Sequence, residues 1–168
     1  KARAIDATLA SQAPPQVAAA ARRASGDAEY VAFENRFRGE REEISARLAD
    51  YVGILKDAAP VLDLGCGRGE MLELLRSNGV TARGVDANAS AVADCRARGL
   101  DVAQGDLVDF LRAQADGSLG AVFAAQVAEH LPPPVLVALM QEAHRALRHA
   151  GLLVIETVNP RSLVGFLD

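Results

Sequence analysis

Aromatic side chains are scarce in this chain of 168 residues: they make up 4% of it, and tryptophan is absent. The core is therefore expected to be aliphatic, and a stacking platform for single-stranded nucleic acid is not expected. Basic residues are not in excess either, because 18 Lys and Arg stand against 22 Asp and Glu and give a net charge of −4. Without a basic surface the phosphate backbone is a poor partner, so no nucleic-acid partner is predicted.

Cysteines and long apolar runs are equally few. The two cysteines, Cys66 and Cys95, lie far apart and in different contexts, which argues against a disulfide framework or a zinc site. No apolar run approaches the roughly 20 residues that cross a membrane, so no transmembrane segment is predicted. The sequence shows no metal-ligand cluster and no signal-peptide pattern, and a reducing cytoplasm is the expected location.

Half of the residues are apolar, and the length suits one folded domain with a short arm. Residues 1–27 are rich in alanine, carry Pro14-Pro15 and are expected to form an arm or linker. Residues 28–58 carry apolar side chains at helical spacing, and a helical cap with a break near Gly39 is predicted there. Residues 59–168 form the predicted core domain.

Short apolar segments alternate with helical ones along the core domain. This alternation predicts an α/β fold, with a parallel sheet covered by helices on both faces. The predicted strands span residues 61–64, 81–85, 100–103, 120–126 and 151–157, and the predicted helices span residues 70–77, 89–98, 107–114 and 134–148.

A glycine-rich segment, Asp63-Leu64-Gly65-Cys66-Gly67-Arg68-Gly69, follows the first predicted strand and opens a helix. Open α/β sheets bind ligands at this place. A P-loop needs Gly-Lys-Ser/Thr after a four-residue gap, which this segment lacks. A dinucleotide fingerprint has its third glycine where this chain has Glu70, whose carboxylate would face a pyrophosphate. A structural turn that holds no ligand is the remaining alternative.

The segment VLDLGCGRGE at residues 61–70 resembles the first motif of the class I S-adenosylmethionine (SAM) dependent methyltransferases, an acidic residue followed by x-Gly-x-Gly-x-Gly. The resemblance implies a Rossmann-like methyltransferase fold that binds SAM and releases S-adenosylhomocysteine. The family's sheet ends in an antiparallel hairpin, which is expected to be missing from this apparently truncated chain. The residues of the segment that the resemblance assigns to the cofactor are Asp63, Leu64, Gly65, Cys66, Gly67 and Gly69.

Two further carboxylates follow predicted strands. Asp86, with Ala87 beside it, stands about 20 residues after the first glycine, where a carboxylate can accept hydrogen bonds from both ribose hydroxyls. Capping the next helix is the weaker alternative for Asp86, because Asn88 or Ser90 can cap it instead. The resemblance places an adenine-contacting acid at Asp106, and Gly105 and Leu107 flank it. Capping of the helix that starts at Leu107 remains an alternative for Asp106.

The segment after the fourth strand, Gln126 to Leu131, resembles the part of the family that lines the pocket beneath the sulfonium. Gln126 and Val127 are expected to face the cofactor. His130 is a candidate general base because the pKa of an imidazole lies near neutral pH. Glu129 is a second catalytic candidate, and a packing role is the alternative for both residues.

The turn before the fifth strand also departs from the family pattern. The family carries Leu-Arg-Pro-Gly-Gly, whereas this chain has Leu-Arg-His-Ala-Gly at residues 147–151. A different turn is therefore expected there.

Motifs outside the cofactor loop narrow the range of molecules that could accept the methyl group. Three segments together resemble a bacterial subgroup found with O-antigen and polysaccharide assembly enzymes. They are residues 33–39, the Glu129-His130 segment and the segment from Glu156 to Pro160. The resemblance implies O-methylation of a sugar or glycan terminus, and association with such enzymes. Arg36 and Arg38 are candidates for binding the SAM carboxylate or an anionic acceptor, with a solvated helix face as the alternative.

Other functions stay open at this point. A SAM-binding regulatory module without transfer activity, or a methyltransferase for another small molecule, has the same cofactor motifs. A nucleotide-binding oxidoreductase is disfavoured by Glu70. The sequence does not indicate an oligomeric state.

Overall fold

A computed structural model describes residues 41–158 of the protein. Its sheet has the order β3-β2-β1-β4-β5, and each neighbouring pair is parallel. The strands are β1 (Val61–Leu64), β2 (Ala82–Asp86), β3 (Val102–Gln104), β4 (Leu119–Ala125) and β5 (Leu147–Glu156). The helices are α3 (Arg41–Leu55), α4 (Glu70–Ser77), α5 (Ala89–Ala97), α6 (Leu107–Arg112) and α7 (Pro133–Ala146), with a 3-10 turn, η1, at Ala128–His130.

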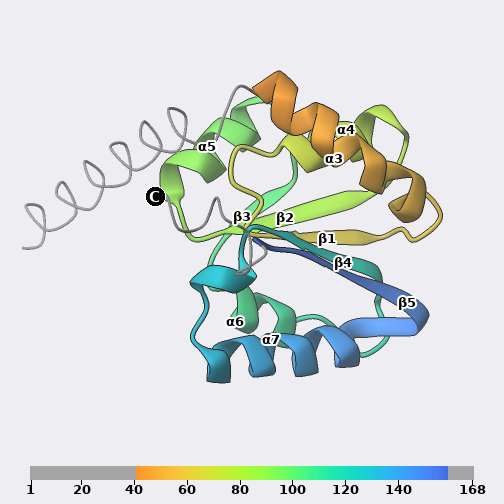
Figure 1. Ribbon diagram of the computed structural model, residues 1–168, viewed down its shortest axis with the longest axis vertical. Coiled ribbons are helices and arrows are strands. Elements are labelled where there is room, and N and C mark those ends of the chain that lie inside the picture. The colour runs from red at the N-terminus through yellow and green to blue at the C-terminus, as the bar shows by residue number, and fades with distance from the viewer. Residues whose placement is uncertain (1–40, 159–168) are drawn as a thin grey trace, which may run out of the picture. The chain divides into compact units, whose positions relative to one another are not determined.

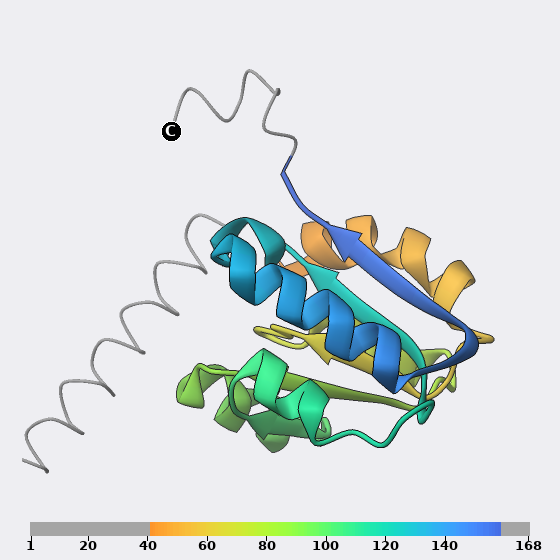
Figure 2. The same cartoon turned by 90° about the horizontal axis from the view of Figure 1, so that it is seen from below.

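The helices cover both faces of the sheet. Figure 1 shows α3, α4 and α5 on one face and α6 and α7 on the other. Figure 2, seen from below, shows α6 and α7 side by side in front of the sheet. The predicted α/β fold, a parallel sheet with helices on both faces, is therefore confirmed. No helix within residues 41–158 is long and apolar enough to cross a membrane.

The strand order reverses at β1, which lies in the middle of the sheet. The chain passes from β1 outward to β2 and β3, and then returns to the other side of β1 to form β4 and β5. Loops that leave adjacent strands on opposite faces separate at such a switch point, and the crevice between them is where open α/β sheets hold ligands. The fold thus directs attention to the carboxyl ends of β1 and β4.

The core is aliphatic, as the scarcity of aromatic residues predicts. Its largest fully buried side chains are leucines and valines together with Phe123. Tyr51 of α3 packs edge-on against Phe123 at 5.3 Å between ring centroids. The apolar stripe of α3 buries Ile44, Leu48 and Leu55, so the described part of the predicted helical cap packs on the core.

The start of β5 differs from the prediction. The strand begins at Leu147, directly after α7, whereas a turn was expected over residues 147–151. The register jumps within this segment, because Leu119 pairs with Leu147 but Ala121 pairs with Leu152. Ala150 adopts a left-handed φ of 59°, which places the irregularity inside the strand.

Some expectations lie outside the described residues. These are the arm over residues 1–27, the part of the helical cap before residue 41 with Arg36 and Arg38, and the C-terminal hairpin.

Candidate cofactor site

The predicted site residues gather at one edge of the sheet. Asp63 and Leu64 end β1 and lead into the glycine loop, Asp86 ends β2, and Glu156 ends β5. Gly105-Asp106 follows β3 and Gln126-Val127 follows β4. All five strands are parallel, so these carboxyl ends meet at a single edge.

The glycine loop adopts a conformation that explains its spacing. Gly65, Gly67 and Gly69 have φ angles of 65°, 50° and 78°, all in the left-handed region that glycine enters without steric cost. A Cβ atom on Gly65 would lie 2.6 Å from Cγ2 of Val127. The loop after β1 therefore packs directly against the segment after β4, at the switch point of the sheet.

Asp86 ties the end of β2 to the glycine loop. Its Oδ2 accepts the backbone N–H of Gly67 at 2.8 Å, and its Oδ1 accepts the backbone N–H of Asn88 at 2.8 Å. Asn88 caps α5 by accepting the N–H groups of Ser90 and Ala91 at 2.9 and 3.1 Å. Asn88, and not Asp86, is therefore the N-cap of α5. Each carboxylate oxygen of Asp86 keeps a second lone pair for a ligand hydroxyl.

Asp106 has a different role in the described structure. Its Oδ1 accepts the backbone N–H groups of Val108 and Asp109 at 2.9 and 3.0 Å, and so it caps α6. The capping alternative is confirmed for this residue. The adenine contact stays a prediction, and the other oxygen of the carboxylate takes no part in the cap.

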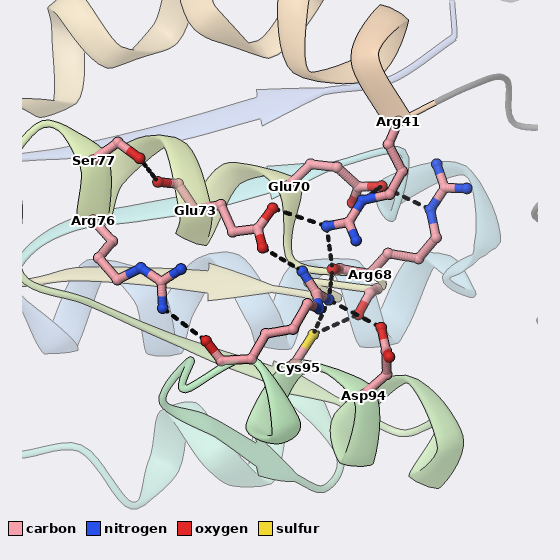
Figure 3. A network of polar contacts seen from close by, with 10 residues as sticks. Arg41, Arg68, Glu70, Glu73, Arg76, Ser77, Asp94 and Cys95 are labelled. Carbon is pink, nitrogen blue, oxygen red and sulfur yellow. Dashed lines mark hydrogen bonds and ion pairs between the residues drawn. The ribbon is translucent and has the colours of Figure 1, made fainter.

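A network of arginines and carboxylates surrounds the glycine loop (Figure 3). Arg41 and Arg98 both donate to the backbone oxygen of Arg68, and the Arg41 bond measures 3.3 Å. The same two guanidinium groups share Glu73, with 2.9 Å from Arg41 Nη2 to Oε2 and 2.6 Å from Arg98 Nη1 to Oε1. The network links α3, α4 and α5, and it fixes a carbonyl group of the loop.

Glu70 lies inside this network. It is 4% exposed, and its Oε1 accepts a hydrogen bond from Arg68 Nε at 2.7 Å. Its charge is therefore balanced within the protein. The repulsion of a pyrophosphate that the sequence suggested is consequently weaker than expected.

The two cysteines meet in the fold although they are far apart in the sequence. Both are free and buried. The Cys95 thiol donates to the backbone oxygen of Gly67 at 3.3 Å. A hydrogen bond with Cys95, together with burial, raises the pKa of the Cys66 thiol. Cys66 is thus a neutral packing group beneath the loop, because a thiol of raised pKa is a poor nucleophile.

The ends of β4 and β5 are joined through Gln126 and Glu156. Gln126 has a left-handed φ of 56°, which is uncommon for a residue with a side chain. Its backbone N–H donates to the backbone oxygen of Glu156 at 2.8 Å, and its Nε2 donates to Glu156 Oε1 at 3.1 Å. Sequence reasoning did not assign Glu156 to the site. Its position as the last residue of a strand at the ligand edge is the signal that could have identified it.

The two catalytic candidates, Glu129 and His130, come shortly after Gln126 and Val127 in the segment that follows β4. Both Glu129 and His130 belong to η1 and are exposed. Glu129 Oε2 accepts the hydroxyl of Thr157 at 2.8 Å, and the backbone N–H of His130 donates to Val127 at 3.1 Å. Their catalytic roles stay predictions. Among residues 41–158, no three His, Cys, Asp or Glu side chains gather in a way that could hold a metal ion.

A hollow of about 290 Å³ lies at the opposite edge of the sheet. It is lined by the residues at the amino ends of the strands, among them Pro60, Thr81, Arg83 and Ser118. None of the predicted site residues borders it, so it is distinct from the ligand edge.

Comparison with known proteins identifies the family. A family model described as "Methionine biosynthesis protein MetW" matches residues 46–150, which is more than half of the chain. The chain belongs to the MetW family. The match includes β1 to β4, the glycine loop and the residues at the carboxyl ends of these strands.

Solved structures and sequence relatives that resemble this MetW-family chain include several methyltransferases. A SAM-dependent methyltransferase from Archaeoglobus fulgidus superimposes with a TM-score of 0.78 and 36% identity, over 82% of this chain and 62% of that one. The ubiquinone biosynthesis O-methyltransferase of Xanthomonas oryzae pv. oryzae (strain PXO99A) is 33% identical over 117 residues, 66% of this chain and 48% of the relative. The glycopeptide N-methyltransferase MtfA, solved with sinefungin, shares the fold at 18% identity and a TM-score of 0.57, over 66% of this chain and 52% of that one.

The chain thus spans about half the length of the curated relatives it matches. These comparisons confirm the methyltransferase fold. The expected polysaccharide-assembly subgroup has no support in them, because the descriptions concern methionine and ubiquinone biosynthesis.

Proposed function

We propose that this MetW-family chain binds SAM and transfers its methyl group to a small acceptor. The observation that carries the proposal is the glycine loop of three left-handed glycines, held to the carboxylate of Asp86 at the switch point of the sheet. This arrangement supplies a close backbone approach and a ribose-binding carboxylate side by side.

The chemistry of the edge fits SAM better than a dinucleotide. Three carboxylates, Asp63, Asp86 and Asp106, lie at the ends of three adjacent strands, whereas the arginines beside the glycine loop, Arg41 and Arg98, are paired with Glu73. SAM carries a positive sulfonium and an ammonium group, whereas a pyrophosphate is negative and favours basic partners. Asp86 and Ala87 would hold the ribose, and Gly105, Asp106 and Leu107 would border the adenine.

The glycine loop would receive the methionine end, through Leu64, Gly65, Cys66, Gly67 and Gly69. Gln126 and Val127 would face the sulfonium, since Val127 already contacts Gly65. Arg38, outside the described residues, remains a proposed partner of the cofactor's carboxylate.

Bound SAM supplies an electrophilic methyl group, so the protein has to align the acceptor and exclude water for an in-line displacement. Glu129 or His130 would then take the proton of the acceptor. A hydroxyl is the proposed nucleophile. A phenolic hydroxyl is favoured by the 33% identity to the ubiquinone biosynthesis O-methyltransferase. A sugar hydroxyl and a role beside polysaccharide-assembly enzymes rest on the motif resemblance alone. A place in the cytoplasm rests on the sequence pattern described above.

Isothermal titration with SAM, S-adenosylhomocysteine and NAD tests the cofactor. We expect binding of the first two and none of NAD, and NAD binding without SAM binding would refute the proposal. Asp86→Asn should weaken SAM by about 10- to 100-fold, because a charged acceptor contributes about 1.5–3 kcal/mol to its hydrogen bonds. Asn88→Ala, which removes only the cap of α5, should cost about 1 kcal/mol of stability and leave the affinity unchanged.

Labelled-methyl transfer then separates an enzyme from a regulatory module. Incubation with methyl-labelled SAM and a panel of phenols, sugar nucleotides and lipid-linked glycans should label at least one hydroxyl-bearing acceptor. Intact SAM binding with no transfer to any of them would favour the regulatory module.

A further inference from the structure

Glu156 presents a carboxylate oxygen for which the described structure provides no partner. Its Oε1 accepts Gln126 Nε2 at 3.1 Å. Its Oε2 is buried, and no group within residues 41–158 forms a hydrogen bond with it. A buried charged oxygen without a hydrogen bond is costly, so its presence calls for an explanation, and a bound water or ion, a ligand or a catalytic role can each supply one.

The Glu156 side chain is held by residues of α3 and of the segment after β4. We name the residues Arg47, Tyr51, Gln126 and Glu156 the Glu156 cluster. Arg47 Nε lies 3.9 Å from Glu156 Oε1, and a hydrogen bond with the Glu156 carboxylate, together with burial, raises the pKa of the Tyr51 phenol. Tyr51 therefore stays protonated, and Arg47 offsets part of the negative charge. The cluster holds the carboxylate through Gln126, Arg47 and Tyr51, and the buried Oε2 is the oxygen without a hydrogen bond.

The strand order places this cluster on the acceptor side of the proposed cofactor. Asp106 follows β3 and Asp86 ends β2, so the adenosine half of SAM would extend to that side of the glycine loop. The sulfonium end must then point the other way, toward β4 and β5. Glu156 ends β5 and is joined to Gln126, whose neighbour Val127 contacts Gly65. The unpartnered oxygen thus belongs to the side from which an acceptor has to approach.

We propose that Glu156, in place of the candidates Glu129 and His130, is the catalytic residue that binds the nucleophilic group of the acceptor through Oε2 and receives its proton. This inference rests on the proposed methyl transfer. A carboxylate oxygen accepts hydrogen bonds and repels anions, so the acceptor group is a neutral hydroxyl or amine and not a carboxylate or phosphate. The sugar and phenol hydroxyls considered above both meet this requirement.

The step balances in atoms and charge. The acceptor's O–H proton passes to Glu156 Oε2, its oxygen forms a bond to the methyl carbon, and the carbon–sulfur bond breaks with its electron pair left on sulfur. A carboxylate, a neutral alcohol and a sulfonium become a carboxylic acid, a methyl ether and a thioether. An amine acceptor gives a methylated amine in the same way.

The test compares Glu156→Gln with Glu156→Asp and with Glu43→Gln, an exposed glutamate on α3. Glutamine can still accept the Gln126 hydrogen bond but offers an N–H₂ group in place of Oε2. SAM affinity is measured by titration, methyl transfer is measured with catechol, UDP-glucose and benzoate as probes, and thermal unfolding verifies that each variant is folded.

We expect Glu156→Gln to keep the SAM Kd within about twofold and to lower kcat/KM for the hydroxyl probes by at least about 100-fold, the range of general acid–base effects. Its melting temperature should match or exceed that of the wild type, because a buried unpaired charge is removed. Glu156→Asp should retain intermediate activity, Glu43→Gln should retain full activity, and benzoate should not be methylated.

The remaining outcomes are distinguishable. Full transfer by Glu156→Gln, or efficient methylation of benzoate, overturns this inference and leaves the proposed function intact. An equal loss of SAM binding shows that Glu156 serves the cofactor and also overturns it. A wild-type protein that binds SAM but methylates no probe of either hydroxyl class, or that does not bind SAM, overturns the transfer function and the inference together.

Discussion

Gly65 combines two constraints at a single residue. Its φ of 65° penalises any side chain by about 1–2 kcal/mol, and an added Cβ would lie 2.6 Å from Val127 Cγ2. We therefore expect Gly65→Ala to lower the free energy of unfolding by more than that strain alone, and to weaken SAM binding at least about tenfold. Urea unfolding and isothermal titration measure the two effects.

Gly79 provides the matched control. It has a φ of 73° and nothing within 4 Å of an added Cβ, so Gly79→Ala should show the backbone strain without the clash. In the double variant with Val127→Ala, the clash is removed, and a coupling of at least about 1 kcal/mol should appear between residues 65 and 127. Equal losses for the two single glycine variants would show that the contact between the loops is not tight.

The carboxylates show how far sequence reasoning reaches at the residue scale. Asp86 and Asp106 follow consecutive strands and precede helices, so the sequence offers the same two roles for each. The structure separates them because Asn88 caps α5 and releases Asp86, whereas α6 begins directly after Asp106. Glu156 was missed because only the fold shows that the end of β5 reaches the same edge, and that one of its oxygens is buried without a partner.

At the scale of elements, Arg98 joins α5 to the glycine loop and to α4. Its side chain is 23% exposed, and it donates to Glu73 Oε1 and to the backbone oxygen of Arg68. Because Glu73 and the loop carbonyl would each lose a charged partner, we expect Arg98→Ala to lower the free energy of unfolding by about 1–2 kcal/mol. SAM affinity should also fall, which titration would detect.

Arg112 is the comparison for this prediction. Its side chain is 55% exposed, and it pairs with Asp109 one turn away in α6 at 3.0 Å and more loosely with Glu142 of α7 at 3.8 Å. Exposed helical pairs contribute about 0.5 kcal/mol or less, so Arg112→Ala should be nearly neutral in both measurements. If the two arginine variants behaved alike, the network around the loop would contribute no more than a surface ion pair.

The bounds of helices and strands were predicted well where the apolar periodicity ends at glycine or asparagine residues that terminate an element. They were predicted poorly where no such residues mark the end. The sequence places α4 at residues 70–77, as observed, because Gly69 precedes it and Asn78-Gly79 ends its apolar pattern. The start of β5 was predicted four residues too late. Residues 148–150 are polar or small and give no strand pattern, yet pairing of Leu147 with Leu119 draws them into the strand. Such pairing is tertiary information that local pattern does not contain.

For the molecule as a whole, the parallel sheet separates two edges, and only one of them should respond to cofactor. SAM at 100 times its Kd stabilises the folded state by about 2.7 kcal/mol. Local openings at the carboxyl edge break the binding site, so SAM should slow amide hydrogen exchange at residues 64–69, 86–88, 105–107 and 126–131. Exchange measured with and without SAM, resolved by peptide, tests this pattern.

The opposite edge serves as the internal control in the same experiment. Amides that border the hollow near Thr81, Arg83 and Ser118 lie at the amino ends of the strands, away from every predicted cofactor residue. Openings confined to that edge leave the site intact, so their exchange rates should not change, whereas amides that exchange only by global unfolding should slow throughout the sheet. Protection centred on the hollow would show that the cofactor binds at the amino ends of the strands and would contradict the proposed site. Protection at residues 126–131 alone would contradict the roles assigned to Asp86 and Asp106.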